Sequence, residues 1–161
     1  MKKILMVTCL LVWASAAGAQ DWVLGLGYSD FTADVSDDSA AITLEYHREP
    51  FYTRGRWDVG TAFALAAHAS GDVFAGIGLA GLYQLDSGWF LEASVVPGLY
   101  IESTLENDLG SAFEIRSLLG VGFTLNSGGR MSLAITHKSN AGTADFNPGV
   151  NSAQVRWRRE F

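Results

Sequence analysis

The most constraining feature of this sequence is a period-two alternation of apolar with small or polar residues. Side chains of a β-strand point alternately to its two faces, so alternation predicts strands that separate two environments. In the first such segment one face carries Trp22, Leu24, Leu26 and Tyr28, and the other carries Val23, Gly25 and Gly27. Seven more segments follow, over Ala41–His47, Trp57–Ala66, Val73–Tyr83, Trp89–Tyr100, Phe113–Leu125, Arg130–Ser139 and Gly149–Phe161.

The first residues have the pattern of a secretory signal peptide. Lys2 and Lys3 precede an apolar run over residues 4–13, and an A-x-A-like site ends at Ala19. The run is shorter than the roughly 20 residues of a membrane-spanning helix. We therefore expect residues 1–19 to be removed and residues 20–161 to form one domain.

Cleavage at that site would change the chemistry available to the chain. It would remove Cys9, the only cysteine, so we expect neither disulfides nor thiolate metal sites. It would also remove two lysines from a chain whose formal charge is already −6. A net acidic chain is a poor binder of nucleic acid, so no nucleic-acid partner is expected.

The segments after Ala19 fit a membrane barrel better than a soluble sandwich. No apolar run there is long enough for a membrane helix, and glycine is abundant while proline is scarce. The polar face mixes small residues with charges, as the filled interior of a narrow barrel requires. Aromatic residues end the apolar faces, which is typical of an interfacial girdle. They are Trp22, Tyr28, Tyr46, Trp57, Tyr83, Trp89 and Trp157, and the chain ends on Phe161.

The predicted fold is thus an all-β, eight-stranded antiparallel transmembrane β-barrel in the cell outer membrane. Bacterial barrels have short periplasmic turns and longer external loops. With the first strand starting on the periplasmic side, the external connections would be Asp30–Ala40, Ala67–Asp72, Ile101–Ala112 and Ser139–Pro148. The periplasmic ones would be Arg48–Arg56, Gln84–Gly88 and Asn126–Gly129.

Several motifs have a structural interpretation that outweighs the functional one. Residues 76–81 match G-x-G-x-x-G, but no helix follows, as a dinucleotide site requires. His47 and His68 could bind a metal with Glu45, yet no close ligand spacing supports this. The acidic stretch containing Asp30, Asp34, Asp37 and Asp38 lacks a defined calcium motif. A cluster that could relay protons is better interpreted as ion pairs filling the barrel; it comprises Glu45, Asp58, Glu92, Glu114 and Arg116.

The seventh and eighth segments carry polar residues on the face that should meet lipid. Continuing the period from Ile135 places His137 and Ser139 on that face, and Asn151 is in phase with Val155. Polar groups are costly on a lipid-facing surface unless they lie near the interface or have a function. A histidine near a serine supplies a base and a nucleophile. The alternative is that both are ordinary interfacial residues, because H-x-S is short and common.

The run His137-Lys138-Ser139-Asn140-Ala141-Gly142, followed by Asn147-Pro148-Gly149, resembles the C-terminal signature of the lipid A 3-O-deacylase (PagL) family. The resemblance is dense over about the last 25 residues. It implies a serine esterase of the outer membrane that hydrolyses the ester-linked 3-position acyl chain of lipid A in lipopolysaccharide. It also implies His137 as general base, Ser139 as nucleophile and Asn140 in the oxyanion hole, with Gly142 and Asn147 shaping the loop or assisting.

The third position of the implied triad departs from the family pattern. Well-known members carry an acid there, whereas this chain has Asn151. An amide can hold the imidazole tautomer but lacks the charge that stabilises the imidazolium. Asp145, in the following loop, is a candidate substitute acid.

The resemblance requires no cofactor and no metal. It makes lipid A and outer-membrane lipid the expected partners, and leaves open a homodimer. The alternatives to an esterase are a non-catalytic barrel of structural or adhesion type and a narrow pore.

Overall fold

The computed structural model describes residues 20–31 and 38–161. The predicted signal peptide and the acidic residues Asp34 and Asp37 lie outside the described residues. The barrel strands are β1 (Asp21–Phe31), β2 (Ser39–His47), β4 (Trp57–His68), β5 (Val73–Gln84), β6 (Trp89–Ile101), β7 (Phe113–Thr124), β8 (Arg130–Ser139) and β9 (Val150–Glu160). Also described are a short strand, β3 (Tyr52–Arg54), and two 3-10 turns, η1 (Asp86–Gly88) and η2 (Leu105–Asn107).

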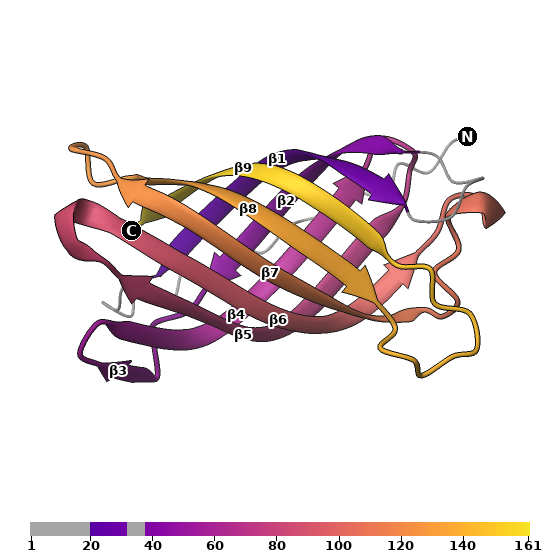
Figure 1. Cartoon of the computed structure of the whole chain (residues 1–161), viewed down its shortest axis with the longest axis horizontal. Helices are drawn as coiled ribbons and strands as arrows, with labels where there is room; N and C mark the ends of the chain where they lie inside the picture. Colours follow the sequence, from indigo (N-terminus) through magenta and orange to yellow (C-terminus); the bar gives the residue numbers. More distant parts are fainter. Residues whose placement is uncertain (1–19, 32–37) are drawn as a thin grey trace, which may run out of the picture.

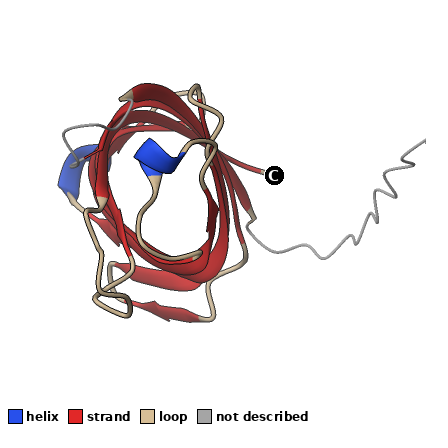
Figure 2. Ribbon diagram, turned by 90° about the vertical axis from the view of Figure 1, so that its right-hand side faces the viewer, coloured by secondary structure: helices blue, strands red, loops and turns tan. Residues whose placement is uncertain are grey.

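The sheet closes on itself. Neighbouring strands run in the order β2-β1-β9-β8-β7-β6-β5-β4, and β2 also pairs with β4. Every pairing is antiparallel, and the first and last strands meet with Asp21 opposite Glu160. Figure 2, which looks along the barrel, shows the resulting ring. The predicted eight-stranded antiparallel barrel is therefore confirmed for the described residues.

The two faces of the sheet are the reverse of those in a soluble protein. Leu133 and Ile135 on β8 are 64% and 65% exposed, whereas the alanines and charged residues between apolar positions face the lumen. An apolar outer surface of this extent suits contact with hydrocarbon rather than water. Within the described residues, no helix is long and apolar enough to cross a bilayer.

Paired charges fill the lumen. Glu45, which is 1% exposed, receives two hydrogen bonds from Arg156, at 2.8 and 3.1 Å, and lies 2.9 Å from Arg116. Glu92 lies 3.2 Å from Arg156 and 3.3 Å from Arg158. Buried charges are tolerated when they are paired and hydrogen-bonded. The lumen of the described barrel is therefore a packed polar core.

The two ends of the barrel differ. In Figure 1 the short turns and the β3 hairpin lie at one end, and the loop after β8 lies at the other. Aromatic pairs gather at the short-turn end, with ring centroids 5.1 Å apart for Trp22 and Tyr46 and 4.7 Å apart for Trp57 and Tyr83. The sequence did not predict β3, which pairs residues 52–54 with the start of β4. It also placed Asp30 in a loop, whereas β1 continues through Phe31.

Candidate active site

Two of the polar residues expected on the lipid-facing side, His137 and Asn151, belong to one row across neighbouring strands, whereas Ser139 lies two residues beyond it on β8. His137 of β8 lies opposite Asn151 of β9, so the expected pairing of these segments is confirmed. Asn151 in turn lies opposite Asp30 of β1, and His137 lies opposite Ser117 of β7. His137, Asn151 and Asp30 are all exposed on the outside of the barrel. The row ends the apolar outer face on the side of the long loops.

A hydrogen bond fixes the His137 ring. Its Nδ1 lies 2.9 Å from Asn151 Oδ1. Because an amide oxygen only accepts hydrogen bonds, Nδ1 carries the proton and donates it. The other ring nitrogen, Nε2, is then unprotonated in the neutral ring and available as a base. Asn151 therefore orients the His137 ring.

Ser139 is the last residue of β8, two positions beyond His137 on the same face. It is half-buried and lies opposite Ile115 of β7. Within the described residues no hydrogen bond joins Ser139 Oγ to His137. Residues two apart on a strand are roughly 6–7 Å apart at the Cα level, a gap that side chains can close, and catalytic hydrogen bonds are often longer without substrate.

Asn140 organises the loop that follows. Its side-chain nitrogen donates to the carbonyl oxygens of Phe146, at 2.8 Å, and Leu109, at 3.0 Å. Its side-chain oxygen accepts from the backbone N–H of Gly142 at 2.9 Å. Its own backbone N–H donates to Asn147 Oδ1 at 3.1 Å. The buried Asn140 thus ties residues 140–147 together and fastens them to the neighbouring β6–β7 loop.

That neighbouring loop is held by a buried carboxylate outside the spanning strands. Asp72 accepts hydrogen bonds from the backbone and side chain of Ser103, at 2.7 and 2.9 Å, and from Ser70 and Asn107, each at 2.7 Å. Burial works to raise the pKa of Asp72, but these hydrogen bonds outweigh it and leave the pKa below its usual range. Hydrogen bonds therefore connect the β4–β5, β6–β7 and β8–β9 loops at this end of the barrel.

Gly149, the residue before β9, lies against the imidazole ring of His137. Its φ is +72°, a conformation that favours glycine. A Cβ at this position would lie 3.0 Å from His137 Cε1 and 3.6 Å from Nε2. The ring therefore packs directly on the glycine backbone.

An apolar groove begins at the row and runs down the outer face. Its first part, of about 530 Å³, is lined by residues that include Asp30, His137 and Asn151. A second part, of about 770 Å³, shares four outer-face residues with the first. The shared residues are Tyr28, Leu119, Ile135 and Ala153. A chain of methylene groups could lie in this groove with its polar end at His137.

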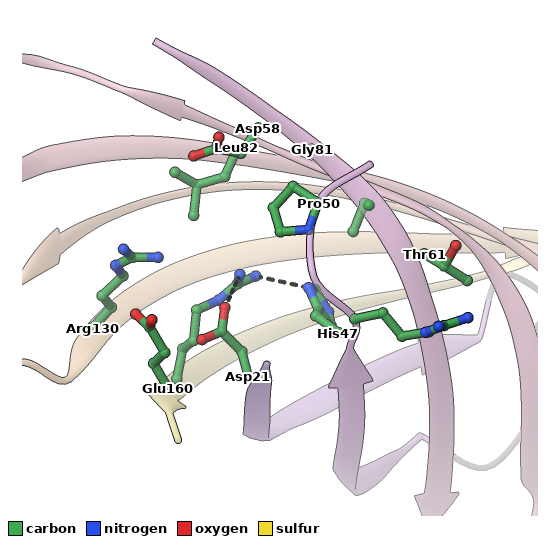
Figure 3. A pocket seen from close by; sticks show the side chains of 13 residues that line it. Asp21, His47, Pro50, Asp58, Thr61, Gly81, Leu82, Arg130 and Glu160 are labelled. Atoms are coloured by element: carbon green, nitrogen blue, oxygen red, sulfur yellow. Dashed lines mark hydrogen bonds and ion pairs between the residues drawn. The ribbon is translucent and has the colours of Figure 1, made fainter. Parts of the chain in front are cut away.

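The lumen offers a different kind of space. A polar cavity of about 110 Å³ at the short-turn end is lined by Asp21, His47 and Arg158, among others (Figure 3). Arg158 donates to Asp21 at 2.9 Å and lies 3.2 Å from His47. These groups neutralise one another, and no set of three or more metal-ligating side chains occurs among the described residues. Arg158, Asp21 and His47 of this cavity are thus engaged with one another.

The remaining motifs have structural explanations in the described barrel. His47 bonds to Glu45 at 2.8 Å, whereas His68 lies 3.2 Å from Lys138 instead. Asp58 accepts from Thr53 and lies apart from the Glu45 cluster. Gly78 of the G-x-G-x-x-G run belongs to β5, and a Cβ there would lie 2.1 Å from the Val95 carbonyl oxygen. Close packing against β6 explains that glycine.

Asp30, which lies in the same row as His137 and Asn151, was not predicted as a site residue. The period of two that runs through Leu26 and Tyr28 continues to Asp30, which was the available signal. Asp145, the candidate substitute acid, is exposed in the 140–149 loop, and no contact with His137 or Asn151 is seen in the described residues.

Comparisons with known proteins agree with this fold. A crystal structure of the outer membrane enzyme PagL superposes with a TM-score of 0.70 at 16% identity, covering 86% of this chain and 97% of that one. The crystal structure of Ail, the attachment invasion locus protein of Yersinia pestis, gives a TM-score of 0.57 at 12% identity, covering 89% and 99%. At these identities the two likenesses concern the fold.

Sequence comparison is more specific. The lipid A deacylase PagL of Bordetella bronchiseptica is 30% identical over 74 residues, which are 45% of this chain. The match spans 42% of the length of that relative. The family model for lipid A 3-O-deacylase (PagL) matches residues 13–160. Because this match covers nearly the whole sequence, the chain belongs to the lipid A 3-O-deacylase (PagL) family.

Proposed function

We propose that this protein is a serine esterase of the bacterial outer membrane that hydrolyses the ester-linked acyl chain at position 3 of lipid A. The observation that carries the proposal is the His137–Asn151 hydrogen bond on the outside of the barrel, at the head of an apolar groove. A substrate that diffuses within the membrane can reach that place without entering the lumen. Family membership supports the same chemistry.

The reaction is acyl transfer to water in two steps. Ser139 Oγ attacks the ester carbonyl while His137 Nε2 takes its proton. The tetrahedral intermediate collapses, the ester C–O bond breaks, and His137 returns the proton to the 3-oxygen of lipid A. Water, deprotonated by His137, then attacks the acyl-enzyme carbonyl; the bond to Ser139 Oγ breaks, His137 returns the proton to Ser139 Oγ, and the fatty acid is released. No metal or cofactor takes part.

The loop after β8 supplies the oxyanion site in this proposal. All hydrogen-bonding groups of the Asn140 side chain are engaged, so Asn140 acts by positioning the loop. Asn147 uses its side-chain oxygen to accept from Asn140, which leaves its amide N–H groups available to a substrate oxygen. Removing one oxyanion donor typically costs about 10²–10³ in kcat. Gly142, at a φ of +76°, permits the turn that brings these groups together.

The groove accounts for substrate choice. Its apolar lining suits an acyl chain, while the glucosamine and phosphates of lipid A would lie beyond the row among the external loops. The acyl chain of a membrane lipid already lies in hydrocarbon, so the groove would hold it by close packing rather than by removing it from water. A lipid with its ester at the polar edge and its chain along the barrel therefore fits the site.

The decisive experiment is mass spectrometry of lipid A from cells that express the wild type, Ser139→Ala or His137→Ala. The wild type should remove one 3-linked acyl chain, and both variants should leave lipid A intact. The variants must reach the membrane in folded form, as judged by heat-modifiable migration. If the wild type removes no acyl chain, the activity is refuted and a non-catalytic barrel is favoured.

A further inference from the structure

Asp30 adds a charged group to the polar row at the loop-side end of the apolar outer face. It follows Leu26 and Tyr28 at the period of two on β1, and its side chain is exposed on the same face. Ionised groups are costly at a lipid-facing surface, so those that occur there usually have a function. The groove that contains His137 and Asn151 is also lined by Asp30.

The strand register places Asn151 directly between Asp30 and His137. Asn151 lies opposite Asp30 on one side and opposite His137 on the other. Side chains directly opposite on antiparallel strands have Cβ atoms about 4.5–5.5 Å apart. A carboxylate at that spacing can accept a hydrogen bond from an amide group, directly or through one water.

The Asn151 amide has the donor that such a contact requires. Its oxygen accepts from His137 Nδ1, which leaves the amide nitrogen as a donor. Among the described residues this nitrogen donates to no protein acceptor. The only charged side chain opposite Asn151 on the outer face of either paired strand in that described part is Asp30.

We propose that Asp30 is a positioning residue that supplies, through the Asn151 amide, the negative charge that the third triad position lacks. This inference rests on the proposed esterase function. Its carboxylate accepts from the Asn151 amide nitrogen and so fixes the amide oxygen toward His137. The same charge stabilises the imidazolium that forms when His137 takes the Ser139 proton. No proton passes along this relay: the proton stays on His137 until it moves to the leaving oxygen.

The size of the effect follows from the strand spacing. Asp30 and His137 are two strands apart, or about 9–10 Å. A unit charge at that distance, at an effective dielectric constant of about 20–40, changes the stability of the imidazolium by roughly a factor of ten. Replacing the carboxylate should therefore lower kcat by about tenfold, less than loss of a directly bonded acid.

The test uses the purified mature protein in detergent micelles with hexa-acylated lipid A as substrate. Asp30→Asn should lower kcat by about tenfold and leave KM nearly unchanged, because the charge acts on the transition state. Asp30→Glu should retain most of the activity, because it keeps the charge. Asp145→Asn tests the other candidate acid, and Glu49→Gln, an exposed acid in the β2–β3 connection, is the control that should behave as the wild type. Heat-modifiable migration verifies that each variant is folded.

A double-mutant cycle isolates the route through Asn151. In an Asn151→Glu background the acid bonds His137 directly, so Asp30→Asn should reduce kcat by clearly less than it does in the wild-type background. Such non-additivity is not expected if Asp30 merely stabilises the barrel.

Four results would overturn the inference. An Asp30→Asn variant with wild-type kcat refutes it while leaving the esterase intact. If Asp30→Asn instead raises KM, and a chelator abolishes this difference from the wild type, Asp30 would be assigned to binding a cation that bridges lipid phosphates. If Asp145→Asn lowers kcat and Asp30→Asn does not, the negative charge that acts on His137 would be assigned to Asp145 in the loop after β8. A wild type with no more activity than Ser139→Ala refutes the esterase itself, and the inference with it.

Discussion

At the scale of single residues, the packing of His137 on Gly149 gives a sharp prediction. Gly149→Ala adds a Cβ 3.0 Å from His137 Cε1 at a φ of +72°, so the ring must shift from the position in which it bonds Asn151. We expect kcat toward lipid A to fall by at least about tenfold, as small displacements of catalytic groups do. Gly128→Ala is the matched control, because it has a φ of +83° and open space around it. Equal activity of the two variants would contradict this role.

The sequence predicts which residues of the candidate site share one face of a strand, but it does not predict all of their partners on neighbouring strands and loops. The period of two places His137, Ser139 and Asn151 on one face, and the pairing of β8 with β9 agrees. On its other side Asn151 pairs with Asp30, and this pairing forms only when the barrel closes and joins residues more than a hundred positions apart. The predicted first strand ended at Tyr28, so Asp30 was placed in a loop. The acceptors of Asn140 lie in other loops, so no local pattern could reveal them.

At the scale of strands, the groove depends on one small residue on the outer face. Ala153 of β9 lies between Tyr28 of β1 and Ile135 of β8 and lines both parts of the groove. Ala153→Phe should fill the groove and lower kcat/KM for lipid A by about tenfold or more, while a soluble short-chain ester remains a substrate. Ala75→Phe is the control, an exposed alanine on β5 far from the row. The acyl-groove assignment fails if both variants deacylate lipid A equally well.

Strand positions were predictable because each barrel strand separates lipid from a filled lumen, which enforces alternation along its length. The ends of the strands were not predictable, because hydrogen-bonded pairing of the strands continues beyond the apolar band. β1 extends to Phe31, and β3 forms only because the start of β4 projects past β2 and needs a partner. Tyr52–Arg54 is exposed along its length and carries no periodic signal.

At the scale of the whole molecule, the charges that stabilise the described barrel and the residues of the proposed site lie on opposite faces of the sheet. The lumen contains the paired charges, and the outer face contains the histidine and serine of the proposed site. A sequence pattern can show that one face is charged and small, as it did here for Glu45, Glu92 and Arg116. It cannot show which charges pair, because Glu45 and Arg156 meet only after the barrel closes.

This separation predicts opposite effects for mutations inside and outside the barrel. Glu45→Gln keeps the volume but leaves Arg116 and Arg156 without their carboxylate, which should cost about 3–5 kcal/mol of unfolding free energy. Urea unfolding in lipid vesicles, followed by tryptophan fluorescence, measures this loss. Glu49→Gln, an exposed acid in the β2–β3 connection, should change stability by less than about 0.5 kcal/mol.

The folded fraction of Glu45→Gln should still deacylate lipid A at the wild-type specific rate, because His137 lies on the other side of the sheet. Ser139→Ala should show the converse, with unchanged unfolding and no deacylation. A Glu45→Gln protein that is fully stable yet inactive would place the chemistry in the lumen. That outcome would require a substrate path through a core that Glu45, Glu92 and three arginines already occupy.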